Sequence, residues 1–182
     1  MREKSWKWIN VVLLFVVTCV CFGITDHTRS LFIVPVCTDM GISRTDFGIF
    51  NVISTLMGLL LSLGLSKWLH LVKKIKILLF LGALSATVHM ALFGLAGNLW
   101  TLYLAGIVKG GLVAFISVAC ISIFVTRWFD EKRGMVMGAI MAGTGVGGTV
   151  FAPLVSFLIE HFEWRATTLI CALIMAVSAL PA

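Results

Sequence analysis

The sequence predicts an all-α membrane protein with six transmembrane helices. Its 182 residues are 60% hydrophobic and 12% charged, and the mean hydropathy is +1.08. A soluble domain cannot cover its surface with so few polar residues. The apolar residues also gather in six long runs separated by short polar segments, and about 20 apolar residues are enough to cross the hydrocarbon core. The lipid bilayer is therefore the first expected partner.

The first predicted span covers residues 9–37. Its opening run, residues 9–24, follows a basic segment and resembles a signal peptide, but no cleavage site of small residues comes after it and the pattern recurs along the chain. A polar patch at residues 25–30 interrupts the run before apolar character resumes. One long helix of about 29 residues, tilted or broken at the patch, fits both parts.

Short polar segments separate the other spans. Ser43, with Asp46 three residues later, fits the start of a helix, and Gly97 with Asn98 marks a tight turn. The whole segment, residues 1–182, is expected to form one six-helix bundle. The remaining spans are predicted at residues 45–69, 74–96, 99–126, 134–159 and 164–182.

The net charge of +6 comes from Lys and Arg residues that sit between the apolar runs. Nucleic-acid binding needs a basic face, so we expect no such partner. The basic residues gather at the N-terminus and in the loops after the second and fourth runs, whereas the opposite loops offer only Arg44 and Arg165. Because cytoplasmic loops carry an excess of positive residues, both ends of this segment are expected on the cytoplasmic side of the plasma (cytoplasmic) membrane.

The fifth predicted span is rich in small residues. At the period of an α-helix, one set falls close to a single stripe, which predicts close packing of two helix backbones. That set is Gly134, Gly138, Ala142, Gly145, Thr149 and Ala152. Residues 143–148 also match the dinucleotide-binding pattern G-x-G-x-x-G, but no strand precedes them, so we expect no cofactor. The packing candidates are Ala142, Gly143, Gly145, Gly147 and Gly148.

Three charged residues stand out because they lie deep inside predicted spans, where charge is costly and usually functional. Asp26, Arg29 and Lys109 each lie about nine to twelve residues from one end of their spans, so they share nearly one depth. Both cations favour the ionised carboxylate, and Arg29 can pair with Asp26 along the helix. The three charges sum to plus one, which favours an anion. Alternatively, Asp26 and Arg29 neutralise each other and Lys109 reaches water.

Other candidates for chemistry carry weaker signals. His27 is a candidate for coupling, although a lone His in a span is more often a packing residue. The odd number of cysteines and the lack of a C-x-x-C pair argue against a metal site and a disulfide framework. No Ser/His/Asp set, cluster of metal ligands or nucleotide loop occurs at a useful spacing, so we expect neither an enzyme nor a bound metal.

The sequence resembles the N-terminal six-helix half of a major facilitator superfamily transporter, nearest in look to the oxalate/formate-exchanger and monocarboxylate-transporter branch. The matching residues include Pro35, residues 39–44, residues 98–103, residues 127–154 and Trp164 with Arg165. The resemblance implies one half, built of two three-helix repeats, of a twelve-helix fold. It also implies a cytoplasmic gate and hinge at Arg127, Asp130, Lys132, Arg133, Gly134 and Gly138.

One family motif, the glycine-and-charge motif between the second and third spans, is only partly present. Its terminal basic residues survive as Lys73 and Lys74. Trp68 stands where the family has an acidic residue, however, and Leu71 where it has glycine. This departure leaves the usual network of cytoplasmic gating charges in question.

We therefore expect a secondary active transporter that works by alternating access on a small organic anion such as a monocarboxylate or dicarboxylate. A second six-helix half, in the same or another chain, is the expected partner, because the chain stops where the family's central linker would begin. The alternatives are a transporter of a neutral or cationic solute and a membrane scaffold or sensor half that does not transport.

Overall fold

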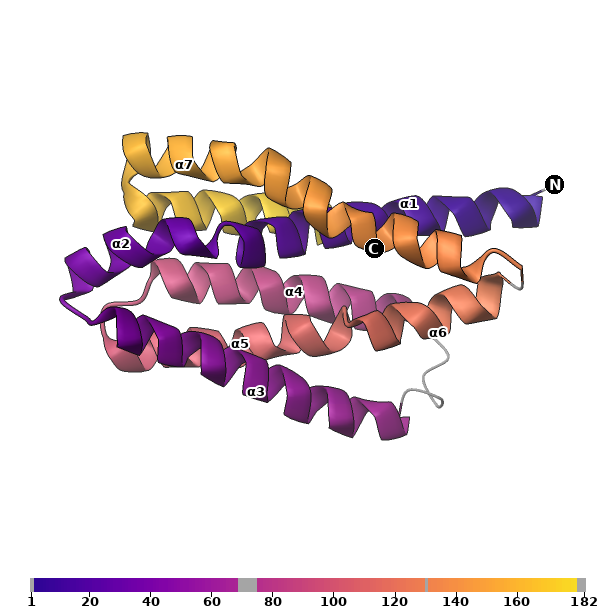
Figure 1. Cartoon of the computed structure of the whole chain (residues 1–182), viewed down its shortest axis with the longest axis horizontal. Coiled ribbons are helices and arrows are strands. Elements are labelled where there is room, and N and C mark those ends of the chain that lie inside the picture. The colour runs from indigo at the N-terminus through magenta and orange to yellow at the C-terminus, as the bar shows by residue number, and fades with distance from the viewer. Residues whose placement is uncertain (1, 69–74, 130, 180–182) are drawn as a thin grey trace.

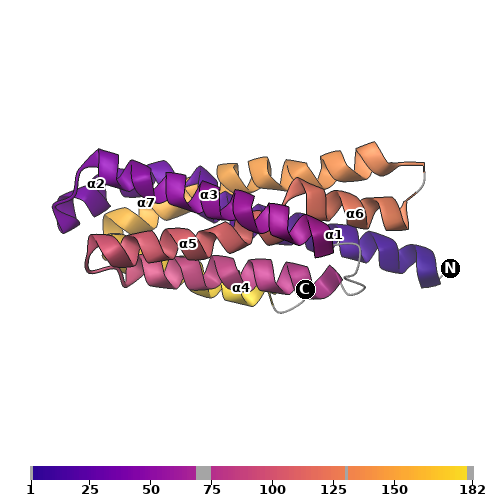
Figure 2. The same cartoon turned by 90° about the horizontal axis from the view of Figure 1, so that it is seen from below.

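The structure is a computed structural model that describes residues 2–68, 75–129 and 131–179, and every element in these ranges is helical. The helices run roughly parallel or antiparallel in an elongated bundle (Figures 1 and 2). In chain order the elements are α1 (Arg2–Phe22), the π-helix η1 (Gly23–His27), α2 (Arg29–Met40), α3 (Arg44–Trp68), α4 (Ile75–Gly94), α5 (Leu99–Phe115), α6 (Val118–Trp128) and α7 (Arg133–Ala179).

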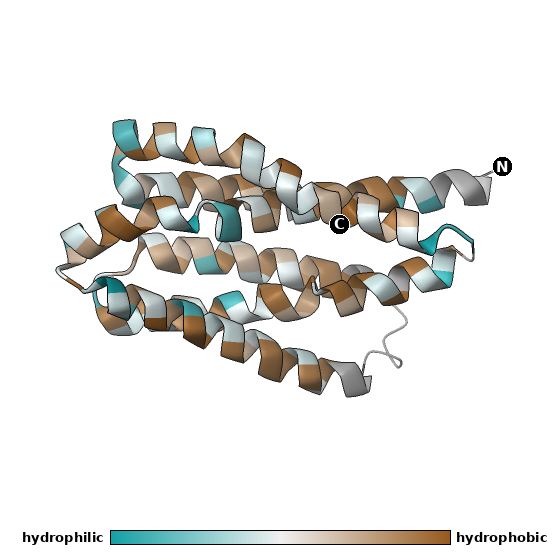
Figure 3. Cartoon of the chain, viewed as in Figure 1, coloured by the Kyte–Doolittle hydropathy of each residue, from teal (hydrophilic) through white to brown (hydrophobic). Residues whose placement is uncertain are grey.

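These elements confirm the predicted all-α membrane fold, and the predicted spans can be located on them. The first span consists of α1, η1 and α2, the fourth of α5 and α6, and α7 contains both the fifth and the sixth. Five stretches of the described helices are long and apolar enough to cross a membrane. The last, Arg133–Ser178, turns back at Glu163, whose φ of 63° and ψ of 161° are not helical. Figure 3 shows apolar residues along all of these helices.

The first span is broken where the sequence places its polar patch. The hydroxyl of Thr25 donates to the carbonyl of Cys21 at 2.7 Å, and the hydroxyl of Thr28 donates to the carbonyl of Ile24. Such side-chain bonds compete with the backbone ladder and bend helices. The chain forms five π-helical residues here and returns to α-helix at Arg29. Of the two alternatives for the first span, a tilted or a broken helix, the structure has the broken one.

The fourth span is also broken, which the sequence analysis did not predict. The α-helix stops at Phe115, and Ser117 adopts an extended conformation with φ −67° and ψ 156°. The Ser117 hydroxyl then accepts a hydrogen bond from the Cys120 amide at 3.3 Å and caps α6. The span predicted over residues 99–126 therefore consists of two helices, because a serine within the apolar run starts a new helix.

The first and fifth spans pack backbone against backbone. A Cβ atom added at Gly143 would overlap the Phe15 carbonyl, and one added at Gly147 would overlap the Cys19 carbonyl. The Thr18 hydroxyl donates across the same interface to the Ile140 carbonyl at 3.1 Å. Small residues permit this approach, as is common between helices in lipid.

The packing stripe predicted on α7 lies on the wrong side of the helix for this contact. Nothing lies within 4 Å of a Cβ added at Gly134, Gly138 or Gly145, and Ala142 is exposed. The face buried within the chain carries Val136, Ile140, Gly143, Gly147 and Val155. Of the packing candidates, Gly143, Gly147 and Gly148 make close contacts, whereas Ala142 and Gly145 do not. Small residues occur on both sides of the helix, and periodicity alone does not show which side packs within the chain.

The second and fourth spans pack in a related way. A Cβ added at Gly58 would overlap Val113 of α5, and one added at Gly106 would overlap the Phe50 carbonyl of α3. The first span thus packs on the fifth and the second on the fourth, while α4 contacts both α5 and α7. Spans one to three thus pack mainly on spans four to six. This arrangement fits the predicted pair of three-helix repeats.

A polar clamp joins three spans at the end of the bundle opposite the N-terminus (Figure 1). The Asp39 carboxylate accepts hydrogen bonds from Arg165 Nη2 at 2.9 Å and from Trp164 Nε1 at 3.3 Å. Arg165 Nη1 also donates to the Ala96 carbonyl at 2.9 Å. The clamp connects the ends of the first and third spans to the start of the sixth. It thereby holds α2, the second helix of the broken first span, in place.

We predict that Gly147→Ala lowers the stability of the protein by about 1–3 kcal/mol, because the added methyl group forces α7 away from the Cys19 carbonyl. Thermal unfolding of the purified protein in detergent measures the effect. Gly145→Ala is the matched control, since a Cβ at that position meets open space. Equal midpoints for the two variants would contradict the assigned packing face.

Candidate functional site

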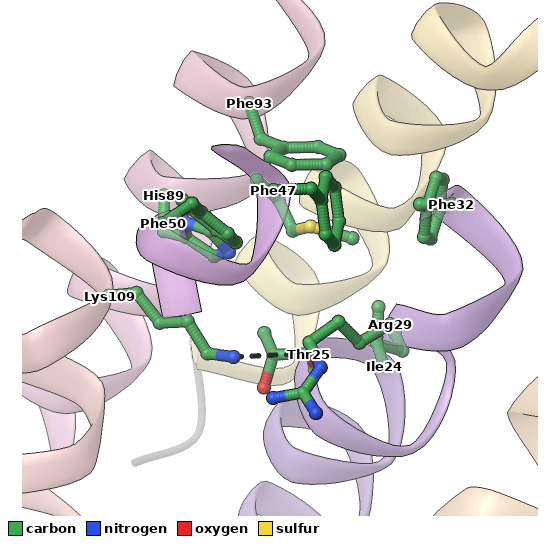
Figure 4. Close-up of a pocket in the computed structure, with 10 residues that line it drawn as sticks. Ile24, Thr25, Arg29, Phe32, Phe47, Phe50, His89, Phe93 and Lys109 are labelled. Atoms are coloured by element: carbon green, nitrogen blue, oxygen red, sulfur yellow. Dashed lines mark hydrogen bonds between the residues drawn. The ribbon is translucent and has the colours of Figure 1, made fainter. Parts of the chain in front are cut away.

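The three intramembrane charges lie around the break in the first span. Arg29 and Lys109 line one small pocket, together with the backbone around Thr25 (Figure 4). Aromatic rings of α3 and α4 form much of the remaining wall, together with Phe32 of α2. The cavity volume is about 20 Å³, close to the room needed by one water molecule. The described pocket is therefore too small to enclose an organic molecule.

Lys109 and Asp26 form an ion pair between the fourth and first spans. Lys109 Nζ lies 2.7 Å from Asp26 Oδ1 and 3.4 Å from the Thr25 carbonyl oxygen. The Lys109 side chain is 3% exposed, whereas that of Asp26 is 38% exposed. A buried ammonium needs a partner of opposite charge, and here the distorted segment of the first span supplies it.

Arg29 does not pair with Asp26, although the sequence spacing allows it. The bend at Thr28 separates the two residues, so the i to i+3 geometry of a regular helix is lost. Arg29 Nη1 instead donates to Asn51 Oδ1 of α3 at 3.2 Å. The Asn51 amide is held in place because its Nδ2 donates to the Phe47 carbonyl at 3.0 Å.

The pairing leaves an uneven distribution of charge. Asp26 and Lys109 neutralise each other, whereas Arg29 is exposed and its partner Asn51 is neutral. Among the described residues of the pocket, the excess positive charge therefore resides on Arg29. A guanidinium can bind a carboxylate through two parallel hydrogen bonds, and this arrangement offers such a group to an anion.

The wall opposite the charges is aromatic. His89 is 3% exposed, and its ring is stacked on Phe50 with centroids 5.9 Å apart. Its Nδ1 donates to the Ala105 carbonyl at 2.9 Å, because a carbonyl oxygen can only accept. Phe50 and Phe93 continue this surface with ring centroids 5.6 Å apart. The wall gives an apolar surface beside a positive group.

The sequence analysis did not single out Asn51 or the aromatic wall. Asn51 was detectable in principle, since it is an amide within an apolar span, where polar side chains are uncommon. The phenylalanines carry no such signal, because they look like any other apolar residue of a membrane helix. His27 was named as a candidate, but its side chain packs on Gly148 of α7 and is not part of the pocket lining.

The expected cytoplasmic gate is only partly described. Lys73, Lys74 and Asp130 lie outside the described residues. Gly134, Gly138 and Lys132 are exposed, and Arg133 Nε donates to the Phe129 carbonyl at 2.7 Å. The ring of Trp8 in α1 contacts that of Phe129, with centroids 5.4 Å apart. The gating role of these residues and of Arg127 stays a prediction.

Comparison with known proteins gives consistent matches over most of the chain. A family model described as Major Facilitator Superfamily matches residues 7–182. Human monocarboxylate transporter 12 is 30% identical over 170 residues, which cover 92% of this chain and 32% of that protein. Rat monocarboxylate transporter 13 is 25% identical over 186 residues, covering 92% of this chain and 39% of the relative. The chain thus spans about a third of the length of these relatives.

A third relative covers a shorter segment. It is the probable transporter MCH2 of Saccharomyces cerevisiae, which is 33% identical over 85 residues. The match covers 46% of this chain and 18% of the yeast protein.

We predict that Lys109→Met destabilises the protein by about 3–5 kcal/mol, because it leaves the Asp26 carboxylate unpaired at bilayer depth. The double variant Asp26→Asn with Lys109→Met should recover most of this loss, since a neutral pair carries no unpaired charge. Thermal unfolding of both single variants and the double variant completes the cycle. Lys132→Met at an exposed site is the control. Losses that simply add would show that the two charges are not coupled.

Proposed function

The chain belongs to the major facilitator superfamily, and on this premise we propose that it forms the N-terminal six-helix half of a secondary active transporter for a small organic anion. Family membership confirms the predicted family. Together with relatives that are named as transporters, it supports a multi-pass transporter of the membrane rather than an enzyme. The substrate class, the partner half and the mechanism of the whole protein are parts of this proposal.

The observation that carries the proposal is the position of Arg29. Its guanidinium lines the pocket and, among the described residues, its hydrogen-bond partner is the neutral Asn51 amide, whereas the other two charges cancel. A carboxylate that replaced the Asn51 oxygen would gain a charge-assisted and bidentate contact. The nearby aromatic wall would hold the apolar part of such a molecule. A monocarboxylate or dicarboxylate of modest size fits both features.

The break in the first span supports an anion at the same place. Arg29 is the first residue of α2, and no side chain caps the start of this helix. The first turn of a helix carries a partial positive charge. In transporters with broken membrane helices, such starts point at anionic parts of the substrate. The Arg29 guanidinium and the start of α2 therefore both favour an anion at this position.

A second six-helix half would complete the site. The pocket is open and small in this chain, and the relatives are about three times longer than the matched segment. In alternating access, two such halves rock around a substrate held near the middle of the membrane. The exposed small-residue side of α7 provides a smooth surface on which the second half could move. We place both ends of this segment in the cytoplasm and the protein in the plasma membrane, from the distribution of basic residues.

We predict that Arg29→Gln lowers the rate of uptake of mono- and dicarboxylates about 10-fold or more, because a hydrogen bond to a charged group contributes about 1.5–3 kcal/mol. Arg29→Lys should retain part of the activity, since it keeps the charge and loses the planar fork. Initial rates of uptake of radiolabelled acids by proteoliposomes that contain the intact protein give the measurement.

Arg44→Gln serves as the matched control, because Arg44 is an exposed arginine at the end of α3, away from the pocket. Both variants must reach the liposomes in equal amounts. Unchanged uptake by Arg29→Gln would remove Arg29 from the substrate site. Saturable uptake of a neutral or cationic solute, with no uptake of acids, would replace the proposed substrate class.

A further inference from the structure

We propose that the break in the first span forms a binding site for a small monovalent cation, and that the ammonium group of Lys109 permanently occupies it. The role of this site in transport rests on the proposed function: Lys109 would take the place of a free cation in the intact transporter. The site itself is inferred from the contacts of Lys109 alone.

The ligands of the ammonium are the kind that bind alkali cations. Lys109 Nζ contacts a carboxylate oxygen of Asp26 at 2.7 Å and the backbone carbonyl oxygen of Thr25 at 3.4 Å. These two oxygens belong to neighbouring residues of one distorted segment. In broken membrane helices, unwound carbonyls and the ends of half helices coordinate sodium ions or protons. Here a side chain from another span occupies that position.

The backbone around Thr25 also favours positive charge. The π-helix ends at His27, two residues after Thr25, and α2 starts only at Arg29. The last turn of a helix carries a partial negative charge from carbonyls that lack partners. The hydroxyls of Thr25 and Thr28 are donors to earlier carbonyls, so their oxygen lone pairs remain available to a cation.

The geometry gives a cation both a place and a route. Lys109 belongs to α5, and its side chain is 3% exposed, so it fills its position completely. The Asp26 side chain is 38% exposed, so small species from outside the chain can reach its carboxylate. Shortening Lys109 to Ala removes the ammonium and most of the stem, which leaves a vacant space beside a carboxylate that water can reach. A carboxylate at bilayer depth is costly without a counterion, so a cation from solution should enter.

The test is the thermal stability of the intact protein in different chloride salts at equal ionic strength. Lys109→Ala should show a rise in Tm of roughly 3–5 °C in 100 mM sodium or potassium chloride relative to N-methyl-D-glucamine chloride, whose cation is too large to enter. Methylammonium chloride should stabilise this variant as well, because it restores the missing group. The unaltered protein should show no difference among the salts.

Two further variants make the result specific. In Asp26→Asn with Lys109→Ala the carboxylate is gone, so the difference between salts should disappear. Lys109→Ser keeps the vacant space and provides a second variant if Lys109→Ala does not fold. Failure of both to fold even in sodium and potassium would overturn the proposal, because a bound cation should replace the ammonium. An equal salt effect in the unaltered protein or in the double variant would overturn it too.

This measurement separates the cation site from the proposed function. The thermal stability measurement needs no substrate and no transport. Its result is therefore independent of whether Arg29→Gln loses anion uptake. Where uptake is measured, Lys109→Ala should transport at least 10-fold faster with sodium or potassium than with N-methyl-D-glucamine, whereas the unaltered protein should not depend on the salt. If Lys109→Ala binds the cation while the unaltered protein transports no anion, the cation site stands and the proposed substrate class is overturned.

Discussion

The ion pair between Lys109 and Asp26 constrains the rest of the structure. An ammonium that is 3% exposed inside a membrane helix must meet an acceptor of opposite charge, so the fourth span has to approach the first at this depth. The acceptor comes from the distorted segment Gly23–His27, and a regular helix would present Asp26 and Arg29 together. The π-helical distortion thus separates the two side chains, and one of the two cations stays without a carboxylate.

Close helix packing makes this separation possible. Gly23 and Gly147 meet where the first and fifth spans cross, at the first residue of the distorted segment. On the other side, Gly106 and Gly110 bring α5 against α3, and Lys109 lies between them in sequence. The glycines therefore position both partners of the ion pair. Phe47 and Phe50 of α3 are buried against α4, and Phe50 also packs on α5. This packing brings the neighbouring Asn51 opposite Arg29.

The sequence was informative about element type and depth, and much less about orientation. Hydropathy identified six spans, and intramembrane charge identified Asp26, Arg29 and Lys109, because both signals arise from transfer into lipid. Which partner Asp26 chooses depends on a bend at Thr28 that propensity does not encode. The buried face of α7 likewise depends on which of two sides with small residues packs within the chain, and the cap at Ser117 was hidden in an apolar run. Each of these is decided by tertiary contacts.

The uneven charge also bears on how such a site can work. A transporter must hold its substrate firmly enough to select it and weakly enough to release it. Two free cations at bilayer depth would bind a carboxylate tightly and would be costly when the site is empty. Neutralising Lys109 with Asp26 leaves a single guanidinium, whose empty state is stabilised by the Asn51 amide. In the proposed transporter, Arg29 would exchange its neutral hydrogen-bond partner, the Asn51 amide, for the charged carboxylate of the substrate. The gain in binding free energy would be moderate, which would allow the substrate to leave again on either side of the membrane.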